Sequence, residues 1–352
     1  MFTKILVPLD GSERAERAIL VAARIARASS ASILLVRVVE IPGEYPTHFA
    51  EPPLTNEHEA TKEATDYLNQ VAQSKDLTGF EVKTEVLFGA PAAMLLEATK
   101  TSHADLIVMC SHGYTGFKRW MLGSVADKMA RHTPVPVLIL REHGPAPLTP
   151  IMVSPVPLRA LVPLDGSELS EEALEPTVQM LMTLAPDTAK ELHLLRVVDL
   201  PAIAGVGKSQ AHLTASIIAE AEKEAMDYVV ALTHRLQKEI PESSQITISA
   251  AVVVDTDVAA AIIKGAEAGG KPDEGGYHGY HLIGMATHGR GALPRWMLGS
   301  ITERVLHHTN LPLLVVRPGK MVQSEPEKVD VDTDKLHTEA EKGDFPEFPA
   351  IL

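Results

Sequence analysis

The sequence contains a single cysteine, Cys110, so no disulfide can form within the chain. A protein without disulfides is typical of a reducing compartment, and we therefore expect a cytoplasmic location. No apolar run approaches the roughly 18 residues that a membrane-spanning helix needs. The first residues lead directly into a predicted strand at 5–9, so we expect neither a signal peptide nor a membrane partner.

An excess of positive charge is also missing. The chain has 32 Lys and Arg against 46 Asp and Glu, a net charge of −14, and its basic residues form no cluster or stripe. We therefore expect no nucleic-acid partner. The histidines and the cysteine are not spaced as a ligand set, so no metal bound by side chains is expected. Residues 319–352 hold nine acidic residues and four lysines without a helical or strand period, which predicts a disordered acidic tail.

What the sequence does contain is a duplicated stretch. Ser111-His112-Gly113 is followed after nine residues by Gly123-Ser124, and Thr287-His288-Gly289 is followed after nine residues by Gly299-Ser300. Each copy lies between an apolar run and an amphipathic stretch, which predicts a loop that joins a buried strand to a helix. Residues 5–13 recur at 160–168 in the same way. The period is too long for a solenoid, so we expect two complete domains that pair as a homodimer would, about a pseudo-twofold axis.

Strands and helices are predicted to alternate in each half. In the first half, strands are expected at 5–9, 33–39, 82–88, 105–109 and 135–140, and helices at 13–28, 57–73, 91–101 and from 125. Continuous apolar strands between helices indicate an α/β fold with two doubly wound five-stranded parallel sheets in tandem. We assign residues 1–142 and 158–318 to the domains and the proline-rich 143–157 to a linker. The second half carries 21 extra residues, of which the clearest part is a predicted surface loop from Gly265 to Tyr280.

Three features of each half are expected to meet at the carboxyl ends of its strands, where doubly wound sheets bind ligands. They are an aspartate after the first strand (Asp10 or Asp165), a valine at the end of the second (Val38 or Val197), and the glycine loop before a helix. A carboxylate can accept hydrogen bonds from a base or ribose, a valine can pack on a base, and a helix N-terminus attracts phosphate. The combination favours a nucleotide.

With these motifs the sequence resembles the universal stress protein family in its tandem two-domain form, over about residues 1–142 and 158–318. The family's nucleotide motif is Gly-x2-Gly-x9-Gly-Ser/Thr. Both copies match three of its four marked positions, and the first glycine is replaced by Cys110 and by Ala286. The resemblance implies the adenine nucleotide alpha hydrolase-like fold with strand order 3-2-1-4-5. It also implies that the fifth strands of the two halves meet, and it leaves further homodimerisation open.

The resemblance also implies the residues that contact the nucleotide. Asp10 and Asp165 would face the adenine, with Val38 and Val197 at its side. The phosphate and ribose contacts would be Gly113, Gly123, Ser124 and Val125 in the first half and Gly289, Gly299, Ser300 and Ile301 in the second. Arg290 is a further phosphate partner, whereas the first half has the uncharged Tyr114 at that position. We therefore expect unequal sites, of which the second binds more tightly.

The function expected from the resemblance is that of a cytoplasmic ATP-binding stress-response or regulatory protein. The ligand would be ATP, ADP or AMP, with Mg²⁺ on the phosphates left open. No Walker lysine or kinase catalytic loop is present, and His112 and His288 have no evident catalytic partner, so we expect no catalytic residues and no enzyme. Two alternatives remain: a slow ATPase or autophosphorylating enzyme, and an interaction module for an unknown protein partner, with degenerate pockets.

Overall fold

The computed structural model describes residues 1–40, 55–111, 122–141, 157–199, 208–268, 279–289 and 298–319. The elements of the first half are β1 (Lys4–Pro8), α1 (Glu13–Ser29), β2 (Ser32–Val39), α2 (Thr55–Ala72), β3 (Val82–Phe88), α3 (Pro91–Ser102), β4 (Leu106–Cys110), α4 (Ser124–His132) and β5 (Val137–Leu140). Those of the second half are β6 (Leu158–Leu164), α5 (Glu168–Glu171), α6 (Leu174–Leu184), β7 (Lys190–Asp199), α7 (Lys208–Glu239), β8 (Ile246–Asp255), α8 (Val258–Ala268), β9 (Leu282–Ala286), α9 (Ser300–His308) and β10 (Leu313–Val316). The predicted linker and acidic tail lie outside the described residues, apart from Pro157 and Gly319.

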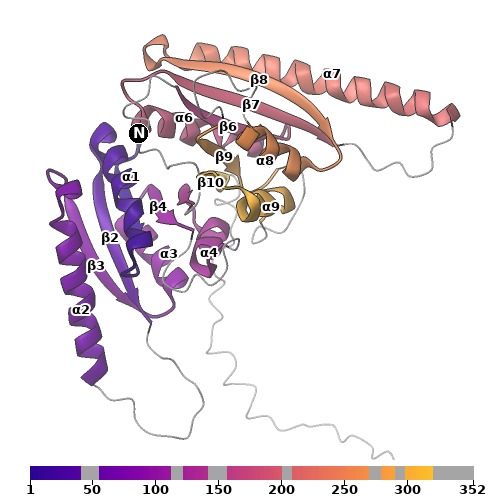
Figure 1. Ribbon diagram of the computed structural model, residues 1–352. Coiled ribbons are helices and arrows are strands. Elements are labelled where there is room, and N and C mark those ends of the chain that lie inside the picture. Colours follow the sequence, from indigo (N-terminus) through magenta and orange to yellow (C-terminus); the bar gives the residue numbers. More distant parts are fainter. Residues whose placement is uncertain are drawn as a thin grey trace, which may run out of the picture.

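The strands form one ten-stranded sheet in the order β3-β2-β1-β4-β5-β10-β9-β6-β7-β8 (Figure 1). Within each half the neighbouring strands are parallel, which confirms the predicted class and the order 3-2-1-4-5. The halves join where β5 pairs antiparallel with β10, with Leu138 opposite Leu314. The order therefore reads the same from either end of the sheet, as expected for two copies related by a twofold axis.

Helices cover both faces of the sheet because its strands are apolar on both sides. In β2, Ile33 and Leu35 pack in one cluster with α1 and α2, while Leu34 and Val36 pack in another with α3 and α4. The second half repeats this arrangement, with α6 and α7 on one face and α8 and α9 on the other. Successive residues of a strand point to opposite faces, so a continuous apolar run satisfies two helical layers at once.

The extra residues of the second half lie mainly in two places. Relative to the first half, seven fall between β7 and β8, where α7 has 32 residues against 18 in α2. In Figure 1, α7 extends past the end of the strands that it covers. A further nine fall between α8 and β9.

The prediction of a surface loop from Gly265 to Tyr280 is wrong at both ends. Helix α8 continues through Gly265 to Ala268, because the helix-forming residues around it outweigh a cost of about 1 kcal/mol for one glycine. Tyr280 is buried against β6 and β7, and its backbone N–H donates to Ala266 O at 2.9 Å. Only residues 269–278 between them lie outside the described part.

The first helix of the second half is divided, unlike its counterpart α1. Helix α5 ends at Glu171, and α6 begins at Leu174. Pro176 explains the break, because proline has no N–H to donate to Glu172 and its ring would clash with that carbonyl. Proline is tolerated in the first turn of a helix, so the chain starts a new helix just before it.

Across the junction of the halves, α4 and α9 are linked by charged side chains. The Arg131 guanidinium contacts Asp127 on its own helix at 2.9 Å and Glu303 on α9 at 2.8 Å. His307 of α9 lies 3.8 Å from Asp127. Arg141 Nη2 donates to Leu306 O, and burial lowers the pKa of Arg141 to about 10. The junction thus combines a strand pair with a polar network between two helices.

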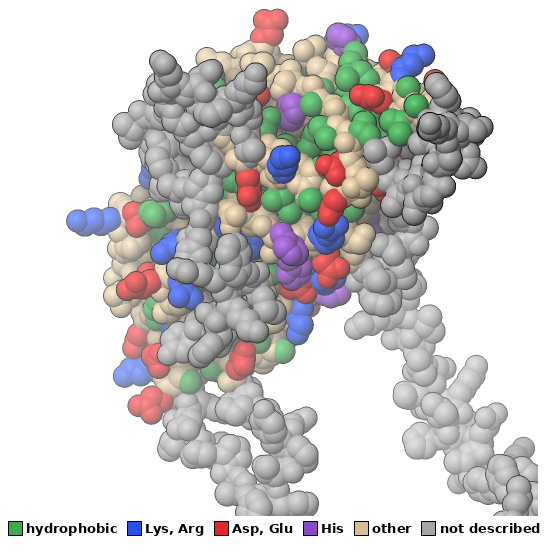
Figure 2. Space-filling view, turned by 45° about the vertical axis from the view of Figure 1, so that its right-hand side comes forward, with side chains coloured by type: hydrophobic (Ala, Val, Ile, Leu, Met, Phe, Trp, Pro, Cys, Tyr) green, Lys and Arg blue, Asp and Glu red, His purple; other side chains and the backbone are tan. Residues whose placement is uncertain are grey.

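Among the described segments, none of the helices combines the length and apolar character that crossing a bilayer requires. On the face shown in Figure 2, the acidic and basic side chains of the described residues are interspersed.

Candidate functional site

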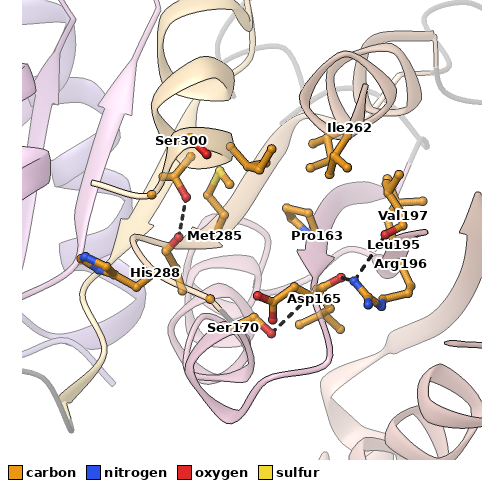
Figure 3. A pocket seen from close by; sticks show the side chains of 17 residues that line it. Pro163, Asp165, Ser170, Leu195, Arg196, Val197, Ile262, Met285, His288 and Ser300 are labelled. Atoms are coloured by element: carbon orange, nitrogen blue, oxygen red, sulfur yellow. Dashed lines mark hydrogen bonds between the residues drawn. The ribbon is translucent and has the colours of Figure 1, made fainter. Parts of the chain in front are cut away.

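Each half has a cavity at the carboxyl ends of its strands, beside the start of α4 or α9. The first, which we call site one, has a volume of about 260 Å³ and includes Asp10, Val38, Gly123, Ser124 and Val125 in its lining. Its counterpart, site two, has a volume of about 210 Å³ (Figure 3). The predicted residues that line site two are Asp165, Val197, Gly289, Gly299, Ser300 and Ile301. The structure therefore brings together every predicted binding residue that it describes.

Two of the predicted binding residues, Gly113 and Arg290, lie outside the described part of the chain. The same holds for Tyr114 and His112 and for the two tryptophans, Trp120 and Trp296. The contribution of the loops between Ser111 and Leu122 and between Gly289 and Leu298 thus stays a prediction. The described part of each site comprises the strand ends, a helix N-terminus and the helices that flank them.

The aspartates are held by the first turn of the following helix. Asp165 Oδ1 accepts hydrogen bonds from Ser167 N at 2.9 Å and Ser167 Oγ at 2.5 Å. Ser167 in turn is the N-cap of α5 and accepts from Ser170 N at 3.2 Å. Asp10 makes the same contacts to Ser12 at 3.0 and 2.6 Å. Each carboxylate therefore braces a turn and also lines its cavity, which fixes its position before any ligand arrives.

The glycine between aspartate and serine is required by the backbone. Gly11 has φ of +87° and Gly166 has φ of +80°, in the left-handed region that side chains other than glycine rarely adopt. The Asp-Gly-Ser sequence thus makes a tight turn that returns the chain from the strand end into the helix. This local chemistry explains why the same three residues recur in both halves.

Gly289 leaves room for the carboxylate of Asp165. A Cβ atom at position 289 would lie 1.8 Å from Asp165 Oδ2, far inside van der Waals contact. The two residues are separated by more than 120 positions in the sequence, yet they meet because β6 and β9 are neighbours in the sheet. Only glycine at 289 allows the aspartate to remain in its observed position.

The N-termini of α4 and α9 open into the sites. Gly123 and Gly299 are the N-cap residues, and their N–H groups donate to Ser111 O at 2.8 Å and Thr287 O at 2.9 Å. Neither glycine has a side chain that could cap the helix, so the N–H groups of the first turn remain available to an anion in the cavity. The positive end of the helix dipole favours negative charge at the same place.

Apolar side chains form the opposite wall of each cavity. In site one the apolar lining includes Val38, Leu95 and Met109, and in site two Val197 and Ile262 form this wall, with Met285 across from them. Figure 3 shows Ile262 and Val197 on one side of site two, with Ser300 and Met285 on the other. A flat aromatic base would fit against such a wall. Sequence reasoning missed the contribution of α3 and α8; the signal was the apolar face of residues 91–101 next to the strand ends.

Sequence reasoning also missed Glu40 in site one and Arg196 in site two. Glu40 follows the second strand of the first half and lines site one. Arg196 lines site two and donates from Nη1 to Leu164 O and Val197 O, both at 3.3 Å. Arg196 belongs to the repeated Arg-Val-Val of the second strand, but its direction could not be read from the repeat, because the matching Arg37 points elsewhere.

The two positions that replace the first motif glycine differ in their contacts. Cys110 is half-buried and donates from Sγ to Arg14 O at 2.9 Å, while it also lines site one. Ala286 is buried and lines site two, where its carbonyl accepts from Thr302 Oγ1 at 2.9 Å. Both side chains fit at a strand end without displacing the cavity. His288 is buried, and its Nδ1 lies 2.9 Å from Thr287 Oγ1, which holds the ring beside site two.

Near each aspartate, a half-buried tyrosine bonds to a helix glutamate. Tyr67 donates to Glu16 at 2.9 Å, and Tyr228 donates to Glu171 at 2.8 Å. Burial, followed by the bond to the glutamate, raises the pKa of both phenols well above the usual value near 10. Both hydroxyls therefore remain protonated donors at neutral pH.

Within the described residues, no group of three or more His, Cys, Asp or Glu side chains is arranged to hold a metal ion.

Comparison with known proteins decides the family. The sequence profile of the universal stress protein family matches residues 1–141 and 158–317. The chain belongs to the universal stress protein family. A universal stress protein of Methanocaldococcus jannaschii is 31% identical over 147 residues, 40% of this chain and 84% of that relative. One of Mycobacterium tuberculosis is 26% identical over 261 residues, which is 71% of this chain and 75% of that protein.

Solved structures agree with the fold of this universal stress protein. The crystal structure of a universal stress protein from Archaeoglobus fulgidus has a TM-score of 0.60 at 20% identity and covers 89% of this chain and 98% of that one. A structure from Pseudomonas aeruginosa has a TM-score of 0.55 at 18% identity, covering 92% and 95%. At this level of identity the likeness concerns the fold alone. The predicted membership in the family and the predicted fold class are thus both confirmed.

Proposed function

We propose that this protein is a cytoplasmic adenine-nucleotide-binding regulator that holds its ligand in two sites and does not turn it over rapidly. One observation carries the proposal: the same constellation lines a cavity in both halves. An aspartate from the first strand, a valine from the second and a Gly-Ser pair at a helix N-terminus converge in each site. The cytoplasmic part of the proposal rests on the single cysteine.

The chemistry of the lining supports a nucleotide better than a simple anion. Phosphates suit the N–H groups at the start of α4 and α9, because these groups have no partner within the helix. A base suits the apolar wall of Val38 or Val197, and its polar edge suits the braced carboxylate. ATP, ADP and AMP all carry these parts, and Mg²⁺ would accompany the phosphates as a ligand of the nucleotide.

The described side chains favour binding of the nucleotide without rapid turnover. The carboxylates of Asp10 and Asp165 each accept two hydrogen bonds from the serine two residues later. A carboxylate held in this way is an anchor, whereas a general base must be free to approach the proton that it removes. Slow hydrolysis and autophosphorylation are outcomes that the experiments below distinguish.

The deciding experiment is to denature the purified full-length protein and identify any nucleotide that is released. We expect an adenine nucleotide, or, for protein freed of ligand, a rise in the unfolding temperature with ATP or ADP. Saturation at 100 times the dissociation constant would stabilise the fold by about 2.7 kcal/mol. A protein that carries no nucleotide and shows no thermal shift would overturn the proposal and favour an interaction module.

A second measurement separates binding from catalysis. Full-length protein is incubated with radiolabelled ATP, and both released phosphate and labelled protein are quantified. We expect neither to exceed the background of a heat-denatured sample. Release or labelling above background that is lost in Asp165→Ala would instead assign enzymatic activity to site two.

A further inference from the structure

The two sites differ in the charge of their lining, although their folds match. Among the described lining residues, site one has two carboxylates, Asp10 and Glu40, and no cationic side chain. Site two has one carboxylate, Asp165, together with the Arg196 guanidinium. The described lining thus carries a formal charge of about −2 in site one and about zero in site two at neutral pH.

Arg37, the counterpart of Arg196, turns toward α2, and its guanidinium lies beside Gly11 in the turn that follows Asp10. Its Nη2 lies 3.4 Å from Glu63 Oε1 on α2, and its guanidinium stacks over the Tyr67 ring at 5.0 Å from the centroid. Tyr67 donates to Glu16, so these side chains form a network on the outer face of the sheet. Arg37 is accordingly absent from the described lining of site one.

In the second half, another cation occupies the corresponding network. Arg235 of α7 contacts Glu171 at 2.5 Å, while Tyr228 donates to the other oxygen of that carboxylate at 2.8 Å. Arg196 instead donates to the carbonyls of Leu164 and Val197, which themselves line site two. The longer helix α7 therefore supplies the charge that Arg37 supplies in the first half, and Arg196 stays at the rim of the cavity.

The acidic residue at the end of the second strand also differs between the two sites. Glu40 and Asp199 occupy matching places at the end of the second strand of each half, and both are exposed, but only Glu40 lines its site. Residues 112–121 and 290–297 each contain two basic residues and no acidic one, so their compositions do not differ in formal charge. The difference in charge between the described linings therefore comes from Glu40 and Arg196.

We propose that the two sites, taken as the nucleotide sites of the proposed function, divide their ligands by charge. Site two takes the nucleoside polyphosphate, because Arg196 offsets Asp165 and leaves the positive helix end unopposed. Site one prefers a less charged ligand of the same kind, such as a nucleoside or its monophosphate, because its two carboxylates repel phosphate but accept hydrogen bonds from amino and hydroxyl groups. Glu40 and Arg196 are the residues that set this difference.

The test is calorimetric titration of full-length, ligand-free protein with ATP and separately with adenosine. We expect one tight ATP event per chain and adenosine binding at both sites. Glu40→Gln should strengthen ATP binding at the weaker site by about fivefold, and Arg196→Gln should weaken it at the tighter site by a similar factor. Adenosine should not share the gain in Glu40→Gln, because it carries no charge that the carboxylate could repel.

The control for Glu40→Gln is Asp199→Asn, which removes one negative charge outside the lining. It should leave the affinities for ATP and adenosine unchanged. Arg196→Lys keeps the charge and should retain most of the ATP affinity. The Glu40→Gln result is a gain of binding, which a misfolded variant cannot imitate. Two equal ATP sites that Glu40→Gln leaves unchanged would overturn the division by charge while the proposed function stands. Absence of binding by both ligands would overturn the proposed function as well.

Discussion

Single residues determine how closely distant parts of the chain approach each other at the two sites. The carboxylate of Asp165 and the backbone of Gly289 occupy adjacent space, although each belongs to a different strand-end turn. The aspartate is held by Ser167, so it has little freedom to withdraw from a larger neighbour. The position of Asp165 in site two therefore depends on the absence of a Cβ atom at residue 289.

We expect Gly289→Ala to lower nucleotide affinity at site two by at least about tenfold, because the added methyl group displaces Asp165 from its turn. Titration calorimetry with ATP measures the effect. The matched control is Gly265→Ala in α8, where the added Cβ meets only Leu195 Cδ2 at 3.6 Å. It should leave affinity unchanged and raise stability by about 0.5–1 kcal/mol. Unaltered ATP affinity in Gly289→Ala would show that the aspartate does not contact the ligand.

His281 lies directly before β9. Its Nδ1 accepts a hydrogen bond from Arg159 N at 3.1 Å, so the ring is held in a neutral form. Burial, with the nearby Arg159 guanidinium, lowers the pKa of His281 to about 4. The unfolded chain takes up a proton near pH 6.5, so the stability from this group is present above that pH and is lost as the pH falls towards 4.

We therefore expect the free energy of unfolding to drop by about 1–2 kcal/mol between pH 7 and pH 5 because of His281. Chemical denaturation across this range measures the slope, and His281→Gln should reduce it. Burial also lowers the pKa of His193, which adds a slope of the same sign, so the wild type and variant are compared directly. The exposed His234→Gln is the control, and an equal slope in wild type and His281→Gln would contradict the assignment.

In each half the fourth strand packs against a helix that follows the first strand. The large and the small residue of this contact are exchanged between strand and helix in the two halves. In the second half, a Cβ atom at Gly284 of β9 would lie 2.0 Å from Thr177 Oγ1 of α6. The matching positions of the first half hold Val108 and Ala22, both fully buried. The larger residue lies on the strand in one half and on the helix in the other, so the same layer spacing is kept with opposite partners.

We expect Gly284→Val to destabilise the protein by about 3 kcal/mol, because overpacking forces α6 away from the sheet. Combining it with Thr177→Ala recreates the pair of the first half and should recover at least half of the loss. Thr177→Ala alone should cost about 1 kcal/mol, mainly through the small cavity that it leaves. The double-mutant cycle is measured by denaturant unfolding, and additive effects would rule out direct packing between the two positions.

On the scale of the whole molecule, the two halves share one sheet and their helical layers are in contact. Leu138 of β5 and Leu314 of β10 face each other across the junction and are fully buried. Helix α1 of the first half packs against α6 of the second, within one apolar cluster. A shared sheet and a shared cluster couple the stabilities of the halves.

We expect a single cooperative thermal transition, with equal calorimetric and van't Hoff enthalpies. Leu138→Ala should lower the unfolding free energy by about 2–5 kcal/mol, since it removes a buried side chain at the junction. Differential scanning calorimetry measures both effects. Two separate transitions, of which Leu138→Ala shifts only one, would show that the halves unfold independently.

The sequence by itself determined the order of elements and most members of each site, and its resemblance to the family implied the strand order. Apolar periodicity reflects the local geometry of strands and helices, and a repeated Asp-Gly-Ser turn or Gly-Ser helix start carries its own backbone requirements. Right-handed crossovers then leave few topologies for alternating strands and helices. Asp10, Val38 and Gly123 could be placed in one pocket from these facts alone.

Only the tertiary structure decided how identical residues differ between the halves. Arg37 and Arg196 occupy the same position in their repeats, yet one pairs with Glu63 and the other lines a cavity. The direction of a long charged side chain depends on which partners the neighbouring elements supply, here Arg235 on α7. Because those partners come from distant parts of the chain, no local pattern of the sequence contains the answer.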